Sequence, residues 1–178
     1  MDNLKQLGIT HIVNCASPVF KDGKEITYSK LTSVHLDASY YRGIGIKKEN
    51  YLSISVLDWP SFDISQFFES TASFIDSVIS PNGEAASCDS SALHKEVNSG
   101  KVVVHCVQGK CRSATIVIAY LLLRTRDPFP SLEEAIRFVK SQRDIFLYGF
   151  GLAGRTKRTS KLNIWEKRRT LNMCRPLT

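Results

Sequence analysis

A cysteine and an arginine spaced for anion chemistry lie in the segment VVVHCVQGKCRSAT, residues 102–115. Five residues separate Cys106 from Arg112, with Gly109 between them. The segment begins as an apolar, strand-like run and ends as helix-like sequence, so the middle is expected to be a loop that closes onto a helix N-terminus. Such a loop points backbone N–H groups inward and, with the helix dipole, forms a cradle for a phosphate group. The residues of this predicted phosphate-binding loop are Val107, Gln108, Gly109, Lys110, Cys111 and Arg112.

The side chains around this loop predict nucleophilic chemistry on phosphorus. A thiol at the base of the cradle lies in a field that stabilises anions, so Cys106 is expected to be a thiolate nucleophile at neutral pH. The planar guanidinium of Arg112 can bind two phosphate oxygens and stabilise the charge of the transition state. Ser113 is placed to donate a hydrogen bond to the departing sulfur, and His105 is expected to order the loop. A buried structural cysteine followed by a helix-capping arginine would not explain the polar loop and the arginine together.

Phosphoryl transfer of this kind also needs an acid that protonates the departing oxygen. Asp58 is the best candidate, because it lies in a turn directly after a predicted strand, residues 51–57. A parallel sheet would deliver that turn to the same edge as the loop after residue 104. The other interpretations are a simple turn aspartate, which is common, and a rival acid at Asp63.

The elements that must position these residues alternate between strand-like and helix-like patterns, which predicts an α/β fold without internal repeats. Short β-branched runs predict strands over residues 9–16 and 51–57, and the apolar run 102–104 predicts a buried strand. Helical spacing starts after Asp63, with Asp63 or Ser61 as the cap. Residues 114–123 predict a central buried helix, and a capping box at Ser131 opens a third helix.

One catalytic domain is predicted over residues 1–154, with a polar insertion loop at residues 80–100 for which disorder is favoured. The chain has 178 residues, of which 43% are hydrophobic and 23% charged, enough for one buried core. This composition excludes collagen, a disordered chain and a disulfide miniprotein. Cations and anions balance up to residue 154, whereas residues 155–178 carry eight cations and only Glu166. This basic tail could attract an acidic partner, nucleic acid or anionic lipid, although a solvated terminus is the favoured interpretation.

The longest apolar run, residues 114–123, is shorter than the roughly 20 residues that a bilayer span needs. Residues 1–3 do not open an apolar signal segment. Five cysteines without framework spacing favour reduced thiols over a disulfide scaffold. We therefore expect a protein with no integral membrane segment, located in the cytoplasm and able to enter the nucleus.

The run HCVQGKCRSATIVIAYLL resembles the active-site motif of the cysteine-dependent protein tyrosine phosphatases, in particular their small, atypical dual specificity branch. LKQLGITHIVNCA is similar to the early helix-to-strand segment of that branch, YLSISVLDWPSFDISQFFESTASFID to its general-acid strand, loop and helix, and SLEEAIRFVKSQR to its penultimate helix. The resemblance covers roughly residues 4–143 with the insertion looped out. It implies a central, mostly parallel sheet of four or five strands flanked by helices. It also implies Cys106 as nucleophile, Arg112 as phosphate clamp, Asp58 as general acid and base, phosphorylated proteins as substrates, and neither a metal nor another cofactor.

Three departures from the family pattern leave alternatives open. The chain lacks the edge strand that usually precedes LKQLGITHIVN, so either it is a shortened form or another segment covers that edge. LYGF at residues 147–150 lacks the usual Pro-Asn, which leaves the C-terminal packing open. Lys110 and Cys111 stand where the branch more often has an apolar residue and serine. For Lys110 a solvated lysine is the favoured interpretation, and a phosphoinositide or inositol phosphate substrate is the alternative. A catalytically weak phosphate-binding adaptor is another alternative for the whole protein. A sulfur-transfer or arsenate-reducing enzyme is a weaker one.

Cys15 is the candidate redox partner of Cys106. It ends the strand expected beside residues 102–104, and some relatives hold a cysteine at the matching place that bonds to the nucleophile on oxidation. Cys111 is the other candidate partner, and a small buried core residue is the alternative for Cys15.

The short chain leaves little room for the loops that deepen a pocket for phosphotyrosine alone. A shallow site that accepts phosphotyrosine, phosphoserine and phosphothreonine is therefore expected. Tyr40 and Tyr41 are candidates for stacking on a substrate, although exposed loop aromatics are as often incidental.

Overall fold

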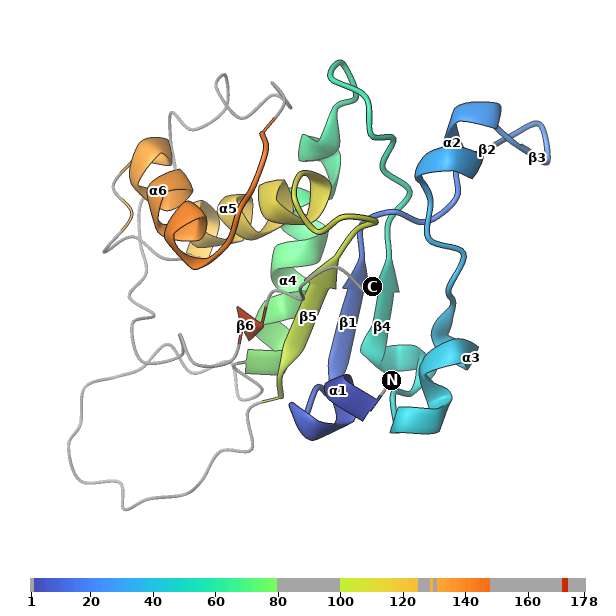
Figure 1. Cartoon of the computed structure of the whole chain (residues 1–178), viewed down its shortest axis with the longest axis horizontal. Coiled ribbons are helices and arrows are strands. Elements are labelled where there is room, and N and C mark those ends of the chain that lie inside the picture. Colours follow the sequence, from blue (N-terminus) through green and yellow to red (C-terminus); the bar gives the residue numbers. More distant parts are fainter. Residues whose placement is uncertain (1, 80–99, 125–128, 130, 148–170, 173–178) are drawn as a thin grey trace.

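The computed structural model describes residues 2–79, 100–124, 129, 131–147 and 171–172. Its main sheet has four parallel strands in the order β4-β1-β5-β6 (Figure 1). The strands are β4 (Tyr51–Ser53), β1 (His11–Asn14), β5 (Val102–His105) and β6 (Leu171–Asn172). The predicted α/β class and mostly parallel sheet are thus confirmed. Most of the predicted insertion loop, residues 80–99, and most of the basic tail lie outside the described residues, so the domain boundaries stay predictions.

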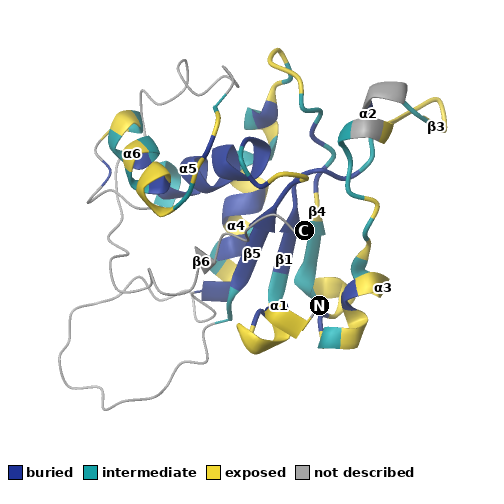
Figure 2. Ribbon diagram, in the orientation of Figure 1, coloured by how far each residue is buried: buried dark blue, intermediate teal, exposed yellow. Residues whose placement is uncertain are grey.

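Two clusters of buried side chains cover the two faces of this sheet. Successive strand residues point to opposite faces, so Val13 and Val104 join one cluster whereas Ile12 and Val103 join the other. Helices α4, α5 and α6 cover the first face, and α1, α3 and η1 cover the second. Figure 2 shows the buried centre in dark blue at β1, β5 and α5. The helices are α1 (Asp2–Gln6), α2 (Thr27–Thr32), α3 (Ala38–Tyr41), α4 (Phe68–Ile79), α5 (Arg112–Arg124) and α6 (Leu132–Gln142), with 3-10 turns η1 (Arg42–Ile44), η2 (Lys48–Asn50) and η3 (Ile64–Phe67).

The three predicted helices form where their sequence patterns place them. Every residue of α5 from Arg112 to Leu121 is buried. This agrees with the central helix predicted from a segment that is apolar on all sides. The Ser131 hydroxyl caps α6 by accepting a hydrogen bond from the Glu134 N–H at 3.3 Å. Asp63 caps the first predicted helix, which starts as η3 and continues as α4. No helix among the described residues is long and apolar enough to cross a membrane.

Two predicted strands are shorter than expected, because side chains replace the neighbouring strand as hydrogen-bond partners. β1 ends at Asn14 rather than residue 16, where the Asn14 side chain accepts the Ala16 N–H at 2.9 Å. β4 ends at Ser53 rather than residue 57, and beyond it the Val56 carbonyl accepts Nη1 of Arg112 at 3.1 Å. Single backbone bonds still join the chain segments there, from the Cys15 N–H to the His105 carbonyl and from the Ile54 N–H to the Asn14 carbonyl, so the regular strand pairing loosens at the edge where the predicted site lies.

The segment between β1 and β4 carries structure that the sequence analysis did not predict. It contains an antiparallel hairpin of β2 (Phe20–Lys21) and β3 (Lys24–Glu25), followed by α2 and α3. The predicted stacking of Tyr41 on a substrate is wrong, because Tyr41 is 2% exposed and belongs to the second core cluster. Tyr40 packs edge-on against it with ring centroids 5.1 Å apart.

Candidate active site

The predicted phosphate-binding loop joins β5 to α5 at the carboxyl edge of the sheet. β5 ends at His105 and α5 begins at Arg112. Gly109, within the loop, has a φ of 69°, in the left-handed region where residues with a side chain are disfavoured. Cys106 is buried, and its Sγ lies 3.3 Å from the Oγ of Ser113 in the first turn of α5. The loop thus brings the predicted nucleophile and the predicted partner of its sulfur together.

Arg112 crosses from the end of the loop to the segment after β4. Its side chain is 2% exposed, and Nη2 lies 3.4 Å from Oδ2 of Asp58. Nη1 donates a hydrogen bond to the Val56 carbonyl at 3.1 Å, whereas Nε has no hydrogen-bond partner among the described residues. A buried guanidinium is tolerated when it is paired, and the Nε–H remains as a donor for an anion in the loop.

Asp58 and Asp63 have different positions, which separates the two candidate acids. Parallel pairing sets Asn14 opposite both Ser53 and His105, so β4 and β5 end at the same edge of the sheet. Asp58, in the turn after β4, reaches Arg112 there. Asp63 instead faces its own 3-10 turn and accepts the Ser65 N–H at 3.0 Å. Of the two, Asp58 is therefore the one in contact with the loop.

His105 supports the loop from inside the protein. It is buried, and Nδ1 lies 3.4 Å from the carbonyl oxygen of Cys106. Burial lowers the pKa of His105 below its ordinary value, so the ring is neutral at pH 7. Nε2 has no hydrogen-bond partner within the described part of the chain. These contacts fit a loop-ordering residue better than a proton carrier.

Cys15 lies beside the candidate nucleophile. The pairing of Asn14 with His105, extended by one residue, sets Cys15 opposite Cys106, and the Cys15 N–H donates to the His105 carbonyl at 2.7 Å. Neighbouring strands are about 4.7–4.9 Å apart, within the Cα separations of about 4.4–6.8 Å that disulfides span. Burial and the adjacent Cys106 raise the pKa of the Cys15 thiol, while Arg112 acts in the opposite direction.

Lys110 is partly exposed and also has partners within the protein. Its Nζ pairs with Oδ2 of Asp144 at 2.9 Å and lies 5.7 Å from the centroid of the Phe146 ring. The Phe146 N–H donates to the Lys110 carbonyl at 3.0 Å. The sequence analysis missed Asp144, Phe146 and the Val56 carbonyl. Their spacing along the chain carries no signal, because each contact depends on the tertiary fold.

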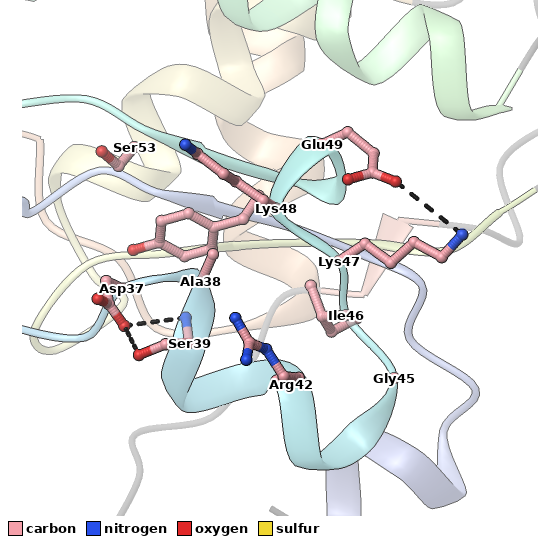
Figure 3. A pocket seen from close by; sticks show the side chains of 11 residues that line it. Asp37, Ala38, Ser39, Arg42, Gly45, Ile46, Lys47, Lys48, Glu49 and Ser53 are labelled. Atoms are coloured by element: carbon pink, nitrogen blue, oxygen red, sulfur yellow. Dashed lines mark hydrogen bonds and ion pairs between the residues drawn. The ribbon is translucent and has the colours of Figure 1, made fainter.

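A separate hollow of about 860 Å³ lies among α3, η1, η2 and β4 (Figure 3). Arg42 and Lys48 point into it from two sides, and Lys47 pairs with Glu49 at 4.0 Å. The hollow runs along β4 from Tyr51 to Ser53, whereas the phosphate-binding loop follows the end of β5. None of the predicted site residues lines it.

The sequence of the chain is similar to a family of known proteins over part of its length. The family model described as "Dual specificity phosphatase, catalytic domain" matches residues 91–157. The chain is 34% identical over 142 residues to dual specificity protein phosphatase 26 of Bos taurus, covering 80% of this chain and 50% of that protein. It is equally identical over 142 residues to human dual specificity protein phosphatase 13B, covering 80% of this chain and 54% of the relative. The chain therefore spans about half the length of the curated relatives it matches.

A solved structure agrees with the fold. The PTP-2 phosphatase of Cydia pomonella superposes with a TM-score of 0.56 at 15% identity, covering 85% of this chain and 73% of that one. At this identity the likeness concerns the arrangement of helices and strands alone. It agrees with a parallel sheet flanked by helices.

Proposed function

We propose that the chain is a phosphatase of the dual specificity branch of the cysteine-dependent protein tyrosine phosphatases and that it hydrolyses phosphomonoesters on proteins, since the dual specificity phosphatase family model matches residues 91–157 and two relatives of that name are 34% identical to it. The proposed substrates are phosphotyrosine and phosphoserine or phosphothreonine side chains. One observation carries the proposal: the loop that begins with Cys106 ends with Arg112, whose guanidinium lies 3.4 Å from the Asp58 carboxylate. A phosphate group bound in this loop would meet a nucleophile, a cation and an acid at once.

In the first step the Cys106 sulfur attacks phosphorus, so that an S–P bond forms and the P–O ester bond breaks. The N–H groups of the loop, residues 107–112, and the Arg112 guanidinium bind the non-bridging oxygens and stabilise their charge. Nε of Arg112, without a hydrogen-bond partner among the residues described, supplies one such donor. Asp58 gives its proton to the departing oxygen, which leaves as an alcohol or a phenol.

In the second step water attacks the phosphorus of the phosphocysteine. Asp58, now a base, takes a proton from the water as the S–P bond breaks and inorganic phosphate is released. The Ser113 hydroxyl, 3.3 Å from the sulfur, stabilises the departing Cys106 thiolate. His105 contributes by holding the start of the loop rather than by carrying protons.

Acceptance of several phosphorylated side chains is supported by the open surroundings of the loop. Val107, within the loop, is 43% exposed, and Trp59, next to Asp58, is 53% exposed. Phe146, bonded to the loop through its N–H, is 60% exposed. Such apolar groups can contact the peptide around a phosphorylated residue without enclosing it.

Hydrolysis of an aryl phosphate by the wild type, Cys106→Ser and Asp58→Ala tests the proposal. We expect Cys106→Ser to lose turnover but to retain binding of a phosphate analogue, and Asp58→Ala to lose most turnover. Equal slow rates in all three proteins would leave the phosphate-binding adaptor as the better description. An inositol phosphate assayed in parallel tests the lipid alternative, which requires faster hydrolysis of that compound than of a phosphopeptide.

We also propose a cytoplasmic protein with access to the nucleus, since the five cysteines of the chain lack the spacing of a disulfide framework and thiols persist in reducing compartments. The basic tail, residues 155–178, would attract an acidic partner or anionic lipid. Co-sedimentation of the full chain with phosphatidylserine vesicles at rising salt tests the lipid interaction, which should weaken as salt screens the charges.

A further inference from the structure

Lys110, which is the second cation of the phosphate-binding loop beside Arg112, is held by a segment that comes after α6. The Nζ of Lys110 lies 2.9 Å from Oδ2 of Asp144 and stands over the Phe146 ring. The Phe146 N–H donates a hydrogen bond to the backbone carbonyl of the same lysine. Ile145, which lies between Asp144 and Phe146 in the chain, is 4% exposed. The segment 144–146 is therefore anchored in the core and presents one carboxylate to the one lysine of the loop.

We infer that Asp144 is a specificity-determining residue, which neutralises Lys110 and so keeps the mouth of the site from favouring substrates with a second phosphate beside the reacting one. This inference rests on the proposed function. It assigns Asp144 a role through Lys110 and not in the chemistry at phosphorus. The substrate class that follows is phosphomonoesters without an adjacent phosphate or comparable dianion.

The charges at this position support the inference. Unpaired, Lys110 would add one positive charge to the loop, and any further anion on the substrate would be attracted to it. Paired with Asp144, the two side chains are together neutral. The Asp144 side chain is 71% exposed and that of Lys110 34% exposed, so the pair adds little to stability, although it cancels the charge. Lys140 and Arg143 also act on Asp144 and remain in place when Asp144 is changed.

The net charge of the pair predicts an order among four proteins. It is zero in the wild type, +1 in Asp144→Asn, −1 in Lys110→Gln and zero again in the double variant. The measured quantity is the ratio of kcat/KM for two phosphotyrosine peptides that differ at one neighbouring residue. That residue is serine in one peptide and a non-hydrolysable phosphonate analogue of phosphoserine in the other, and the ratio cancels effects common to both.

We expect Asp144→Asn to raise the ratio for the phosphonate peptide about three- to tenfold, because one unit charge a few ångströms from a dianion changes the binding energy by that much in screened water. The change should lie in KM rather than kcat. Lys110→Gln should lower the ratio, and both Asp144→Glu and the double variant should return it to the wild-type value. Glu49→Gln, which removes an equally exposed acid paired with Lys47 at the opposite end of the sheet, is the matched control and should leave the ratio unchanged.

An unchanged ratio in Asp144→Asn would overturn the inference. So would a double variant that keeps the raised ratio, or one that falls to the level of Lys110→Gln, since the latter means that Lys110 binds the second anion directly. The same peptides titrated onto Cys106→Ser give the comparison as Kd values, with the Asp144 and Lys110 changes added to that background. Aryl phosphate turnover by the wild type is measured separately, so a failure of the proposed function is distinguished from a failure of this inference.

Discussion

Replacing Asp58 by Asn should tighten the binding of oxyanions while it slows turnover. In the free protein the carboxylate lies 3.4 Å from Nη2 of Arg112, and thus occupies a cation that an incoming phosphate needs. The Arg112 side chain is 2% exposed and that of Asp58 30% exposed, so water shields this pair only in part. Asn keeps the shape of the side chain and removes its charge. The bound anion then no longer competes with Asp58 and no longer meets a like charge.

The size of the effect follows from this separation. Coulomb's law gives about 1 kcal/mol for two unit charges 3.4 Å apart in water and about 5 kcal/mol at an effective dielectric constant of 20. Because Asp58 reaches solvent, the lower part of this range applies. We expect a gain of about 1–2 kcal/mol, or roughly five- to thirtyfold in the Kd of the oxyanion. Loss of the proton donor should lower kcat by about 10²- to 10⁴-fold.

Titration calorimetry with tungstate at pH 7 measures the first effect, and hydrolysis of phenyl phosphate and p-nitrophenyl phosphate measures the second. The loss of kcat/KM should be larger for phenyl phosphate, whose leaving oxygen depends more on protonation. Asp63→Asn is the matched control, since Asp63 faces its own turn and should change neither quantity. Unchanged or weaker tungstate binding in Asp58→Asn would refute the competition for Arg112. Equal losses of kcat/KM for the two esters would refute the role of Asp58 as the acid, since kcat/KM reports on the step in which the ester oxygen leaves.

Three further predictions concern the surroundings of the loop. Peroxide treatment should form a reversible Cys15–Cys106 disulfide, seen by peptide mass spectrometry and retained in Cys111→Ser; Cys106 found only as sulfinic or sulfonic acid would contradict it. Burial lowers the pKa of His105, so below pH 6.5 the unfolded chain binds more protons than the folded one and the free energy of unfolding should fall as the pH is lowered. An NMR titration midpoint of this ring at or above 6.5 would contradict this. Tyr120→Phe removes a hydrogen bond of 3.1 Å to Asp76 on α4 and should cost about 1 kcal/mol, or about 2–4 °C in Tm by calorimetry, whereas an unchanged Tm would show that this bond adds nothing.

The core of the fold could be predicted because its signals are local. Each of three elements is specified within a few residues of sequence. Apolar residues occupy all sides of α5, Ser131 caps α6, and a β-branched run forms β1. The strand ends could not be predicted, because the side chains of Asn14 and Arg112 take over the backbone groups there. A pattern of residue types carries no sign of such replacements.

The site was predictable to the extent that it lies on one loop. Cys106 and Arg112 are held by a single turn between β5 and α5, so their spacing already indicates the chemistry. The proximity of Asp58 follows from the parallel register of two strands, which sequence analysis can anticipate once the sheet is recognised. The pairing of Lys110 with Asp144 joins residues 34 positions apart through the packing of α6 on α5. No pattern near either residue in the sequence indicates it.

The central claim is that the sulfur of Cys106 takes the phosphoryl group from the substrate. Rapid acid quenching of the wild-type protein during hydrolysis of a phosphopeptide, followed by peptide mass spectrometry, tests it most directly. The mechanism predicts a peptide heavier by one phosphoryl group with the modification on Cys106, and none in Cys106→Ser. Phosphate release without any such adduct, or an adduct on another residue, would contradict it.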